Sequence, residues 1–262
     1  MTKRIAVFGG VYSNYLALAA LLEDAPRRGA DRIFCLGDLG AFGPNPNKVF
    51  PLLREAGVPV VQGNYDNSVG NKLADCQCGY TDAQDNYFAR LSYDYTFRNT
   101  SDENKLWMRG LPAELRLDLN GVRVLLCHGS PRKTNEFLWE TTTSTAFLER
   151  LCEAYGADVI VGTHTGLHWQ RVLPSGRHFV NCGAIGRPAN DGRTNVWYAL
   201  ISVDEAKRVA VDFVPLEYDH ENLAAEMQAE HLPQEFIQTI KTGWWTTCLE
   251  VLPMKERTRG IH

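Results

Sequence analysis

Four short polar loops carry the side chains of this sequence that are best suited to chemistry, and each loop follows an apolar run. Their sequences are GD, GNYD, HGSP and THT, at residues 37–38, 63–66, 128–131 and 163–165. Open α/β sheets place ligands at strand ends, so we expect these carboxylate, amide and imidazole groups to converge on one site. Taken singly, Asp38 and Asn64 are also ordinary turn or capping residues, and either histidine is also an ordinary hydrogen-bonded core residue.

The elements expected to position these loops alternate between strands and helices. Short apolar runs that end in glycine-rich loops alternate with amphipathic stretches, which is typical of an α/β fold. The first part of the chain predicts strands at 5–10, 32–38 and 58–64, and helices at 14–25 and 48–56. Asn14 is expected to cap the first helix.

The middle of the chain changes in character. Residues 69–112 are aromatic and polar, with helical periodicity at 84–97 and 102–109, which predicts a helical insert over one face of the sheet. After it, Asn120-Gly121 between two alternating runs predicts a hairpin. The remaining predicted elements are a helix at 144–155, a strand in ADVIVGTH, a hairpin turning at 174–176, strands in VWYALISV and RVAVDFVPL, and helices from 217 that end in an aromatic tail.

The joint order of these motifs resembles the calcineurin-like metallophosphoesterase family, particularly its small bacterial phosphodiesterase branch. GD, GN-x-D, HGSP and a late His-Thr each close a strand, and the AFGPNP, NCGAIGRP and LEYDHENLAAEM segments extend the resemblance from Lys3 to about Pro233. The resemblance implies a mixed α/β fold, a four-layer αββα sandwich of two mixed β-sheets flanked by helices. We expect one domain over residues 1–233, with the insert at about 69–112. The tail, 234–262, is expected to pack on this core or on a neighbouring subunit.

The resemblance also implies metal ligands. The family holds two metal ions about 3.5 Å apart, which activate water and clamp a phosphoryl group. The bridging aspartate matches Asp38, and the other ligands of the second ion match Asn64, His128 and His164. A carboxylate, an amide oxygen and two imidazoles form a mixed oxygen and nitrogen set that suits iron, manganese or zinc.

The other metal position lacks its ligands. Its DxH motif and second histidine correspond here to Gly10, Tyr12 and Gly166. Every ligand unique to that ion is therefore missing, while every ligand of its neighbour is present. We expect one divalent or trivalent transition-metal ion per chain.

Two tyrosines replace residues with chemical roles in the family. Tyr65 stands where a histidine approaches the substrate, and its partner Asp66 is kept, so Tyr65, Asp66 and Tyr12 are the candidate catalytic residues. With a pKa near 10, a tyrosine is a poor proton donor at neutral pH, although it can still donate a hydrogen bond to an oxyanion. For Tyr12 three interpretations stay open: a phenolate ligand, a substrate contact, or a side chain that fills the vacated volume.

Basic residues are candidates for binding an anionic substrate. Four lie on loops that the family fold places near the cleft: Arg132, Lys133, Arg187 and Arg193. A guanidinium there would bind phosphate or carboxylate through two hydrogen bonds, and the alternative is a solvated surface cation. The candidate substrate-binding residues are Arg132, Arg187, Gly10 and Gly166.

Three further features have structural explanations that we favour. His168 is expected on an exposed loop beside Trp169 rather than as an extra metal ligand. Cys76-x-Cys78 has no second pair at zinc-finger spacing, so packing or a lid role is favoured over metal binding. The Trp244-Trp245 pair is expected to dock against the core or a neighbouring subunit.

The composition restricts the kinds of molecule that this protein is expected to bind. The formal net charge of −4 shows no basic footprint for nucleic acid or an anionic membrane, so we expect a small-molecule substrate and leave a homo-oligomer open. No apolar stretch approaches the roughly 20 residues that span a bilayer. Seven scattered cysteines favour reduced thiols over a disulfide framework. We expect a cytoplasmic location.

The sequence therefore favours a metal-dependent hydrolase of the metallophosphoesterase type, acting on a small phosphomonoester or phosphodiester with a single ion. The first alternative is a mononuclear metalloenzyme with altered, non-phosphatase chemistry on the same scaffold. A non-catalytic ligand-binding protein ranks last, because such a protein has no evident need for a four-ligand cluster.

Overall fold

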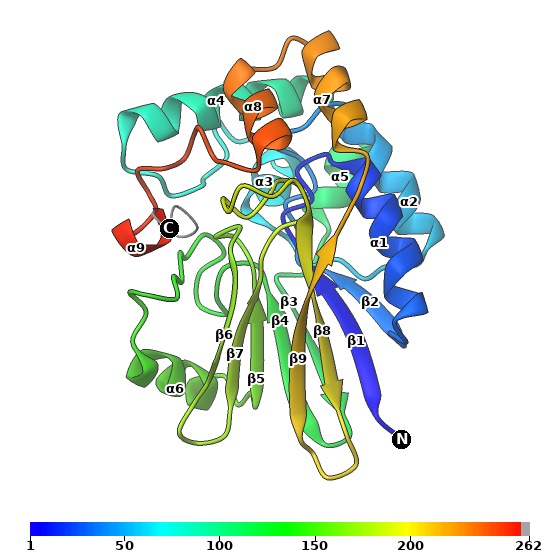
Figure 1. The fold of residues 1–262 in the computed structure, drawn as a ribbon, viewed down its shortest axis with the longest axis vertical. Coiled ribbons are helices and arrows are strands. Elements are labelled where there is room, and N and C mark those ends of the chain that lie inside the picture. The colour runs from blue at the N-terminus through cyan, green and yellow to red at the C-terminus, as the bar shows by residue number, and fades with distance from the viewer. Residues whose placement is uncertain (258–262) are drawn as a thin grey trace.

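The computed structural model describes residues 1–257 and contains two mixed β-sheets (Figure 1). The first sheet has four strands in the order β2-β1-β8-β9. Strand β1 pairs in parallel with β2 and antiparallel with β8, and β8 pairs antiparallel with β9. The bounds of these strands are β1 Lys3–Phe8, β2 Arg32–Cys35, β8 Val196–Val203 and β9 Val209–Leu216.

The second sheet has five strands in the order β3-β4-β5-β7-β6. Its centre is parallel, because β4 pairs with β5 and β5 with β7 in that sense, while β3 and β6 add antiparallel edges. The bounds of these strands are β3 Glu114–Leu119, β4 Val122–Cys127, β5 Val159–Gly162, β6 His168–Val172 and β7 His178–Cys182.

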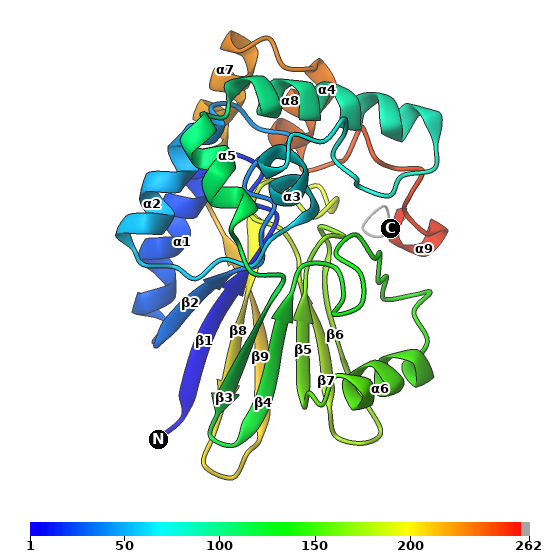
Figure 2. The same cartoon turned by 180° about the vertical axis from the view of Figure 1, so that it is seen from behind.

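Helices cover the outer face of each sheet. Helices α1 (Tyr15–Arg27) and α2 (Val49–Glu55) flank the first sheet, and α6 (Thr145–Ala154) flanks the second on the opposite side of the molecule (Figures 1 and 2). Between the sheets, aliphatic side chains such as Val7 and Val159 form a buried cluster. The predicted four-layer sandwich is confirmed.

Local sequence signals explain several of these elements. The Asn14 side chain accepts a hydrogen bond from the Ala17 N–H and caps α1, as predicted. Asn120 and Gly121 both have positive φ angles, 53° and 81°, which is what a two-residue turn between β3 and β4 requires. Ser144 caps α6 through the Phe147 N–H.

The strand predicted at 58–64 is wrong. Only an isolated bridge between Cys35 and Val60 forms there. The reason is that β2 ends at Cys35, and the Gln62 N–H donates to the Pro112 carbonyl, away from the sheet. The chain then enters a helix at Asn64, so this segment delivers a ligand candidate on a helix rather than on a strand.

Most of the remaining helices gather beyond one end of the two sheets, at the top of Figure 1, whereas α9 lies lower, at the left edge of the picture. They are the short 3₁₀ helix η1 Pro46–Lys48, α3 Asn64–Gly70, α4 Ala83–Asn99, α5 Asp102–Arg109, α7 His220–Ala229, α8 Gln234–Thr242 and α9 Met254–Arg257. Insert residues Val69, Tyr93 and Met108 pack into the cluster on the helical side of the first sheet. The insert therefore joins the layer that covers the strand ends.

The aromatic tail packs on its own chain. Trp245 and Leu252 form a buried cluster with Trp139 and Leu167, which belong to the loops of the second sheet. The Trp245 indole N–H donates to the Pro188 carbonyl. Residues 258–262 of the predicted tail lie outside the described residues. Within the described part of the chain, no helix is both long and apolar enough to cross a membrane.

The inter-sheet cluster yields a stability prediction. Val159→Ala should lower the free energy of unfolding by about 2 kcal/mol, because it removes buried methyl groups and leaves a cavity. Val172→Ala removes the same atoms from a strand residue that is 60% exposed, and should change stability by less than about 0.5 kcal/mol. Urea unfolding followed by tryptophan fluorescence measures both, and equal losses would contradict the buried inter-sheet core.

Candidate metal centre

The four polar loops meet at the end of the sheets that the insert covers. Asp38 follows β2, Asn64 opens α3, His128 comes directly after β4, and His164 follows β5. All four side chains are buried, and none is more than 7% exposed. The parallel neighbours β4 and β5 place the two histidines at one edge of the second sheet, and Asp38, which follows a strand of the first sheet, contacts His128 across the sandwich.

Three of these side chains form a tight cluster. The Asp38 Oδ2 and His164 Nδ1 atoms each lie 3.2 Å from the His128 Nε2 atom, and the three lie within 4.8 Å of one another. Ligand atoms about 2.1 Å from one tetrahedral ion are about 3.4 Å apart. The observed spacing therefore suits a shared cation.

The orientation of His128 is set by the backbone. Its Nδ1–H donates to the Leu36 carbonyl at 2.6 Å, so Nε2 faces Asp38 and His164. A hydrogen bond from the far ring nitrogen to a carbonyl is the usual support of a metal-binding histidine.

The electrostatic environment acts in opposite directions on the two histidines. Burial lowers the pKa of His128, but the Asp38 carboxylate outweighs burial and raises it overall. Burial by itself would raise the pKa of Asp38. The nearby His128 imidazole lowers this pKa by more, so the pKa of Asp38 is lowered overall. Burial, followed by the charge of His128, lowers the pKa of His164 to about 3. His164 is therefore neutral at pH 7 and has a lone pair to offer.

The amide of Asn64, which lines the same pocket as Asp38 and His164, is anchored through its nitrogen. Its Nδ2 donates to the Cys76 carbonyl at 2.9 Å and to the Cys78 sulfur at 3.4 Å, which leaves Oδ1 buried and without a hydrogen-bond partner within residues 1–257. Cys76 and Cys78 form a disulfide, whereas the sequence favoured reduced thiols. The pairing arises because the turn brings their Cα atoms to 5.3 Å, within disulfide range.

These donors form a set that could hold a metal ion. It offers one carboxylate oxygen, one orphaned amide oxygen and two imidazole nitrogens, all shielded from water. This chemistry suits iron, manganese or zinc.

Asp66 holds the turns that carry Asp38 and Asn64. Its Oδ2 accepts from the N–H groups of Asp38 and Gly63, both at 2.8 Å, and its Oδ1 accepts from the Leu39 N–H at 3.0 Å. A Cβ atom at Gly63 would lie 2.3 Å from Asp38 Oδ1, so only glycine permits this approach. Burial and the charge of Asp38 raise the pKa of Asp66 to about 6, against the backbone donors, which lower it. These contacts support a positioning role.

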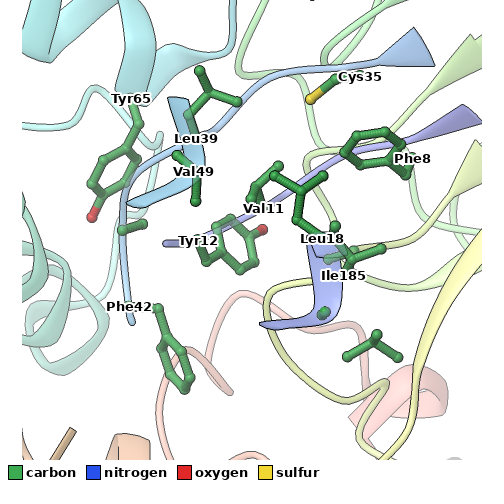
Figure 3. Close-up of a cluster of buried hydrophobic side chains, with 14 of the residues drawn as sticks. Phe8, Val11, Tyr12, Leu18, Cys35, Leu39, Phe42, Val49, Tyr65 and Ile185 are labelled. Atoms are coloured by element: carbon green, nitrogen blue, oxygen red, sulfur yellow. The ribbon is translucent and has the colours of Figure 1, made fainter. Parts of the chain in front are cut away.

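The hydroxyl of Tyr65 is hydrogen-bonded to the helical insert. It donates to Ser92 Oγ at 3.0 Å, and burial raises its pKa, which weakens it further as an acid. Its backbone N–H donates to Asp38 Oδ1 at 3.0 Å. Figure 3 shows that the hydroxyl groups of Tyr65 and Tyr12 point in different directions.

The positions that match the other family metal are filled by side chains. A Cβ atom at Gly10, where φ is +51°, would lie 2.8 Å from both the Tyr12 ring and the Ala184 side chain. A Cβ atom at Gly166 would lie 3.2 Å from the Trp245 ring and 3.6 Å from Arg187 Nη2. This arrangement favours the interpretation of Tyr12 as a side chain that fills volume.

A pocket joins the metal candidates to Arg187. It is lined by Asp38, Asn64 and His164, and by Arg187 on its wall. Its other lining residues come from the segment after Asp38, the insert and the C-terminal part: Tyr12, Ala41, Phe42, Tyr65, Cys78, Tyr80, Phe88, Ala89, Ser92, Phe236, Thr247 and Cys248. Sequence reasoning missed the contribution of Phe236, Thr247 and Cys248, because nothing local ties the C-terminal region to Asp38.

The other predicted residues lie elsewhere. Arg132 is exposed, pairs with Glu136 four residues on, and does not line this pocket. Lys133 and Arg193 are also exposed. His168 was expected on an exposed loop, but it opens β6 and stacks half-buried on Trp197, with ring centroids 4.1 Å apart. Strand pairing with β7 is what draws it inward.

The fold and this buried Asp/Asn/His cluster define a protein of the metallophosphoesterase class. The chain belongs to the calcineurin-like phosphoesterase superfamily, whose domain model matches residues 4–206. Membership of this family supports a metal-dependent phosphoesterase.

Three individual proteins are similar to this chain over most of its length. A metallophosphoesterase from Sphaerobacter thermophilus is 26% identical, with a TM-score of 0.69 over 92% of this chain and 99% of that chain. An uncharacterized protein of Methanocaldococcus jannaschii is 26% identical over 245 residues, which cover 88% of this chain and 94% of that protein. A hypothetical protein of Pyrococcus horikoshii OT3, 20% identical, shares the fold with a TM-score of 0.74 over 93% of this chain and 99% of that chain.

The hydrogen bonds of Asp66 yield a prediction about metal affinity. Asp66→Asn should weaken zinc binding by about 10- to 100-fold, because the amide cannot accept all three backbone hydrogen bonds and Asp38 loses its support. Competition with a chromogenic chelator measures the affinity. Asp118→Asn is the matched control, since this exposed aspartate accepts the Gly121 N–H in a distant turn. Unchanged zinc affinity in a folded Asp66→Asn variant would contradict the positioning role.

Proposed function

We propose that this protein is a metal-dependent hydrolase of a small phosphomonoester or phosphodiester, and that it works with one transition-metal ion. The proposed ligands are Asp38, Asn64, His128 and His164. The observation that carries the proposal is the buried cluster of Asp38, His128 and His164 beside the orphaned Asn64 oxygen, opening into one pocket. When bound there, a metal ion supplies a Lewis acid and lowers the pKa of adjacent water.

The protein's own groups shape the rest of the site. Asp66 and the His128–Leu36 hydrogen bond hold the ligands in place before metal arrives. The walls at Phe42, Tyr80 and Phe88 are aromatic and limit water around the cluster. Such a site is suited to a small substrate whose phosphoryl group enters first.

The tyrosine at position 65 is a poor proton donor for the leaving group. In the family the residue at this position is a histidine, and Tyr65 has a raised pKa with its hydroxyl committed to Ser92. The departing oxygen must therefore carry its own negative charge. Rates should depend strongly on how acidic the leaving group is.

Metal stoichiometry tests the single-ion proposal. Protein stripped with chelator and reloaded with manganese or zinc should regain activity linearly up to one equivalent per chain, as measured by elemental analysis and turnover together. His128→Ala should weaken binding by roughly 100-fold or more, because even changes outside the ligand set cost about 10- to 100-fold. His220→Ala, at the start of α7, is the control. Two tightly bound ions per chain would contradict this proposal.

Leaving-group dependence tests the role of Tyr65. Metal-loaded protein should hydrolyse nitrophenyl phosphate or its diester much faster than the corresponding alkyl ester. Tyr65→His should narrow this difference by supplying a group with a pKa near neutrality. Tyr65→Phe, which keeps the ring and removes the hydroxyl, should leave the difference unchanged. A selective loss of alkyl-ester hydrolysis in Tyr65→Phe would instead identify Tyr65 as the acid.

One observation favours altered, non-phosphatase chemistry as the second candidate. Tyr12, Trp245 and Arg187 fill the space beside Gly10 and Gly166, which remodels the side of the site where the family places its other ion. A folded protein that binds one ion and turns over neither nitrophenyl phosphate nor its diester would move this candidate to first place.

A further inference from the structure

Arg187 is a buried cation whose charge is not balanced by an ion pair. Its side chain is 7% exposed, and its Nε atom is buried with no hydrogen-bond partner within residues 1–257. No carboxylate in this part of the chain forms an ion pair with it. Arginine is almost never fully buried unless it is paired, because desolvating an uncompensated charge is costly. An anionic ligand would relieve this cost.

Three aromatic rings hold the guanidinium in place. Its central carbon lies 3.5 Å from the ring centroid of Trp245, and 5.8 Å and 5.9 Å from those of Tyr12 and Phe42. Stacking on Trp245 covers one face of the guanidinium by a cation–π contact. Its N–H donors lie in the guanidinium plane, so stacking leaves them available for an oxyanion.

Arg187 also stands where the site has lost metal-ligand positions. The N–H groups of Ile185 and Gly186 donate to the carbonyls of Gly9 and Gly10, at 3.1 Å and 2.8 Å, which brings the Arg187 segment beside the first strand's loop. On the other side, Arg187 Nη2 would contact any side chain at Gly166. The guanidinium thus adjoins Gly166, while the backbone that carries it adjoins Gly10, and the side chain lines the pocket with Asp38 and His164.

We propose that Arg187 is the oxyanion-binding residue of this site, a built-in cation that neutralises a phosphoryl oxygen of the substrate where the family's other metal ion would act. The choice of a phosphoryl group rests on the proposed function. A guanidinium forms paired hydrogen bonds to phosphate oxygens and stays charged at any ordinary pH. Unlike a metal ion, it cannot be removed by a chelator. Anion binding should therefore survive the loss of metal.

The test measures inorganic phosphate binding to the full chain after chelator treatment, by isothermal titration calorimetry. The stripped protein should bind phosphate, and Arg187→Gln should weaken this binding by about 10-fold or more, as expected for a hydrogen-bonded charge. Arg187→Lys should give an intermediate loss, because it keeps the charge and loses the planar fork. Arg132→Gln, which removes an exposed guanidinium of the same chemistry, should bind like the parent.

Thermal unfolding of each variant accompanies the titrations, and Arg187→Lys decides the question if Arg187→Gln does not fold. The proposal is overturned if the stripped parent protein binds no phosphate at concentrations that saturate the metal-loaded protein, or if folded Arg187 variants bind it as tightly as the parent. The outcome for hydrolysis is separate. Arg187-dependent phosphate binding without turnover of any phosphoester would refute the proposed function and uphold Arg187 as the oxyanion-binding residue.

Discussion

The site depends on the hydrogen bonds of one buried carboxylate. Asp66 accepts the backbone N–H groups of Asp38, Leu39 and Gly63, and so ties the loop after β2 to the turn that opens α3. These two segments carry a carboxylate and an amide that are candidates for metal binding. If they separated, the histidines after β4 and β5 would face no opposing ligands.

Burial gives this arrangement its chemical character. Asp38 and His128 lie close together away from water, where their charges stabilise each other, while His164 stays neutral. The same exclusion of water makes Arg187 costly to leave unpaired. The site therefore combines a cluster of candidate metal ligands with a buried guanidinium that forms no ion pair within residues 1–257. A metal ion and a phosphoryl group would complement both.

The helical insert and the C-terminal segment supply the cover. Ser92 of α4 accepts a hydrogen bond from the Tyr65 hydroxyl, and the Trp245 ring stacks on the Arg187 guanidinium. Both contacts fix the position of a polar side chain that lines the pocket, Tyr65 in one case and Arg187 in the other. The parts of the chain outside the sandwich thus decide how the site differs from the family pattern that its sequence resembles.

The sequence by itself predicted that Asp38, Asn64, His128 and His164 converge, because each lies in a polar loop after a predicted strand, and the resemblance of the same motifs to a known family implied the sandwich. It also located the caps and turns at Asn14 and Asn120-Gly121. Tertiary structure decided what depends on distant contacts. Residues 58–64 form only an isolated bridge, because the Gln62 N–H bonds to the Pro112 carbonyl instead of extending the sheet. Arg187 rather than Arg132 lines the pocket, and its guanidinium stacks on Trp245. Such contacts join segments far apart in the chain, and no local pattern encodes which of several chemically equivalent side chains will be buried.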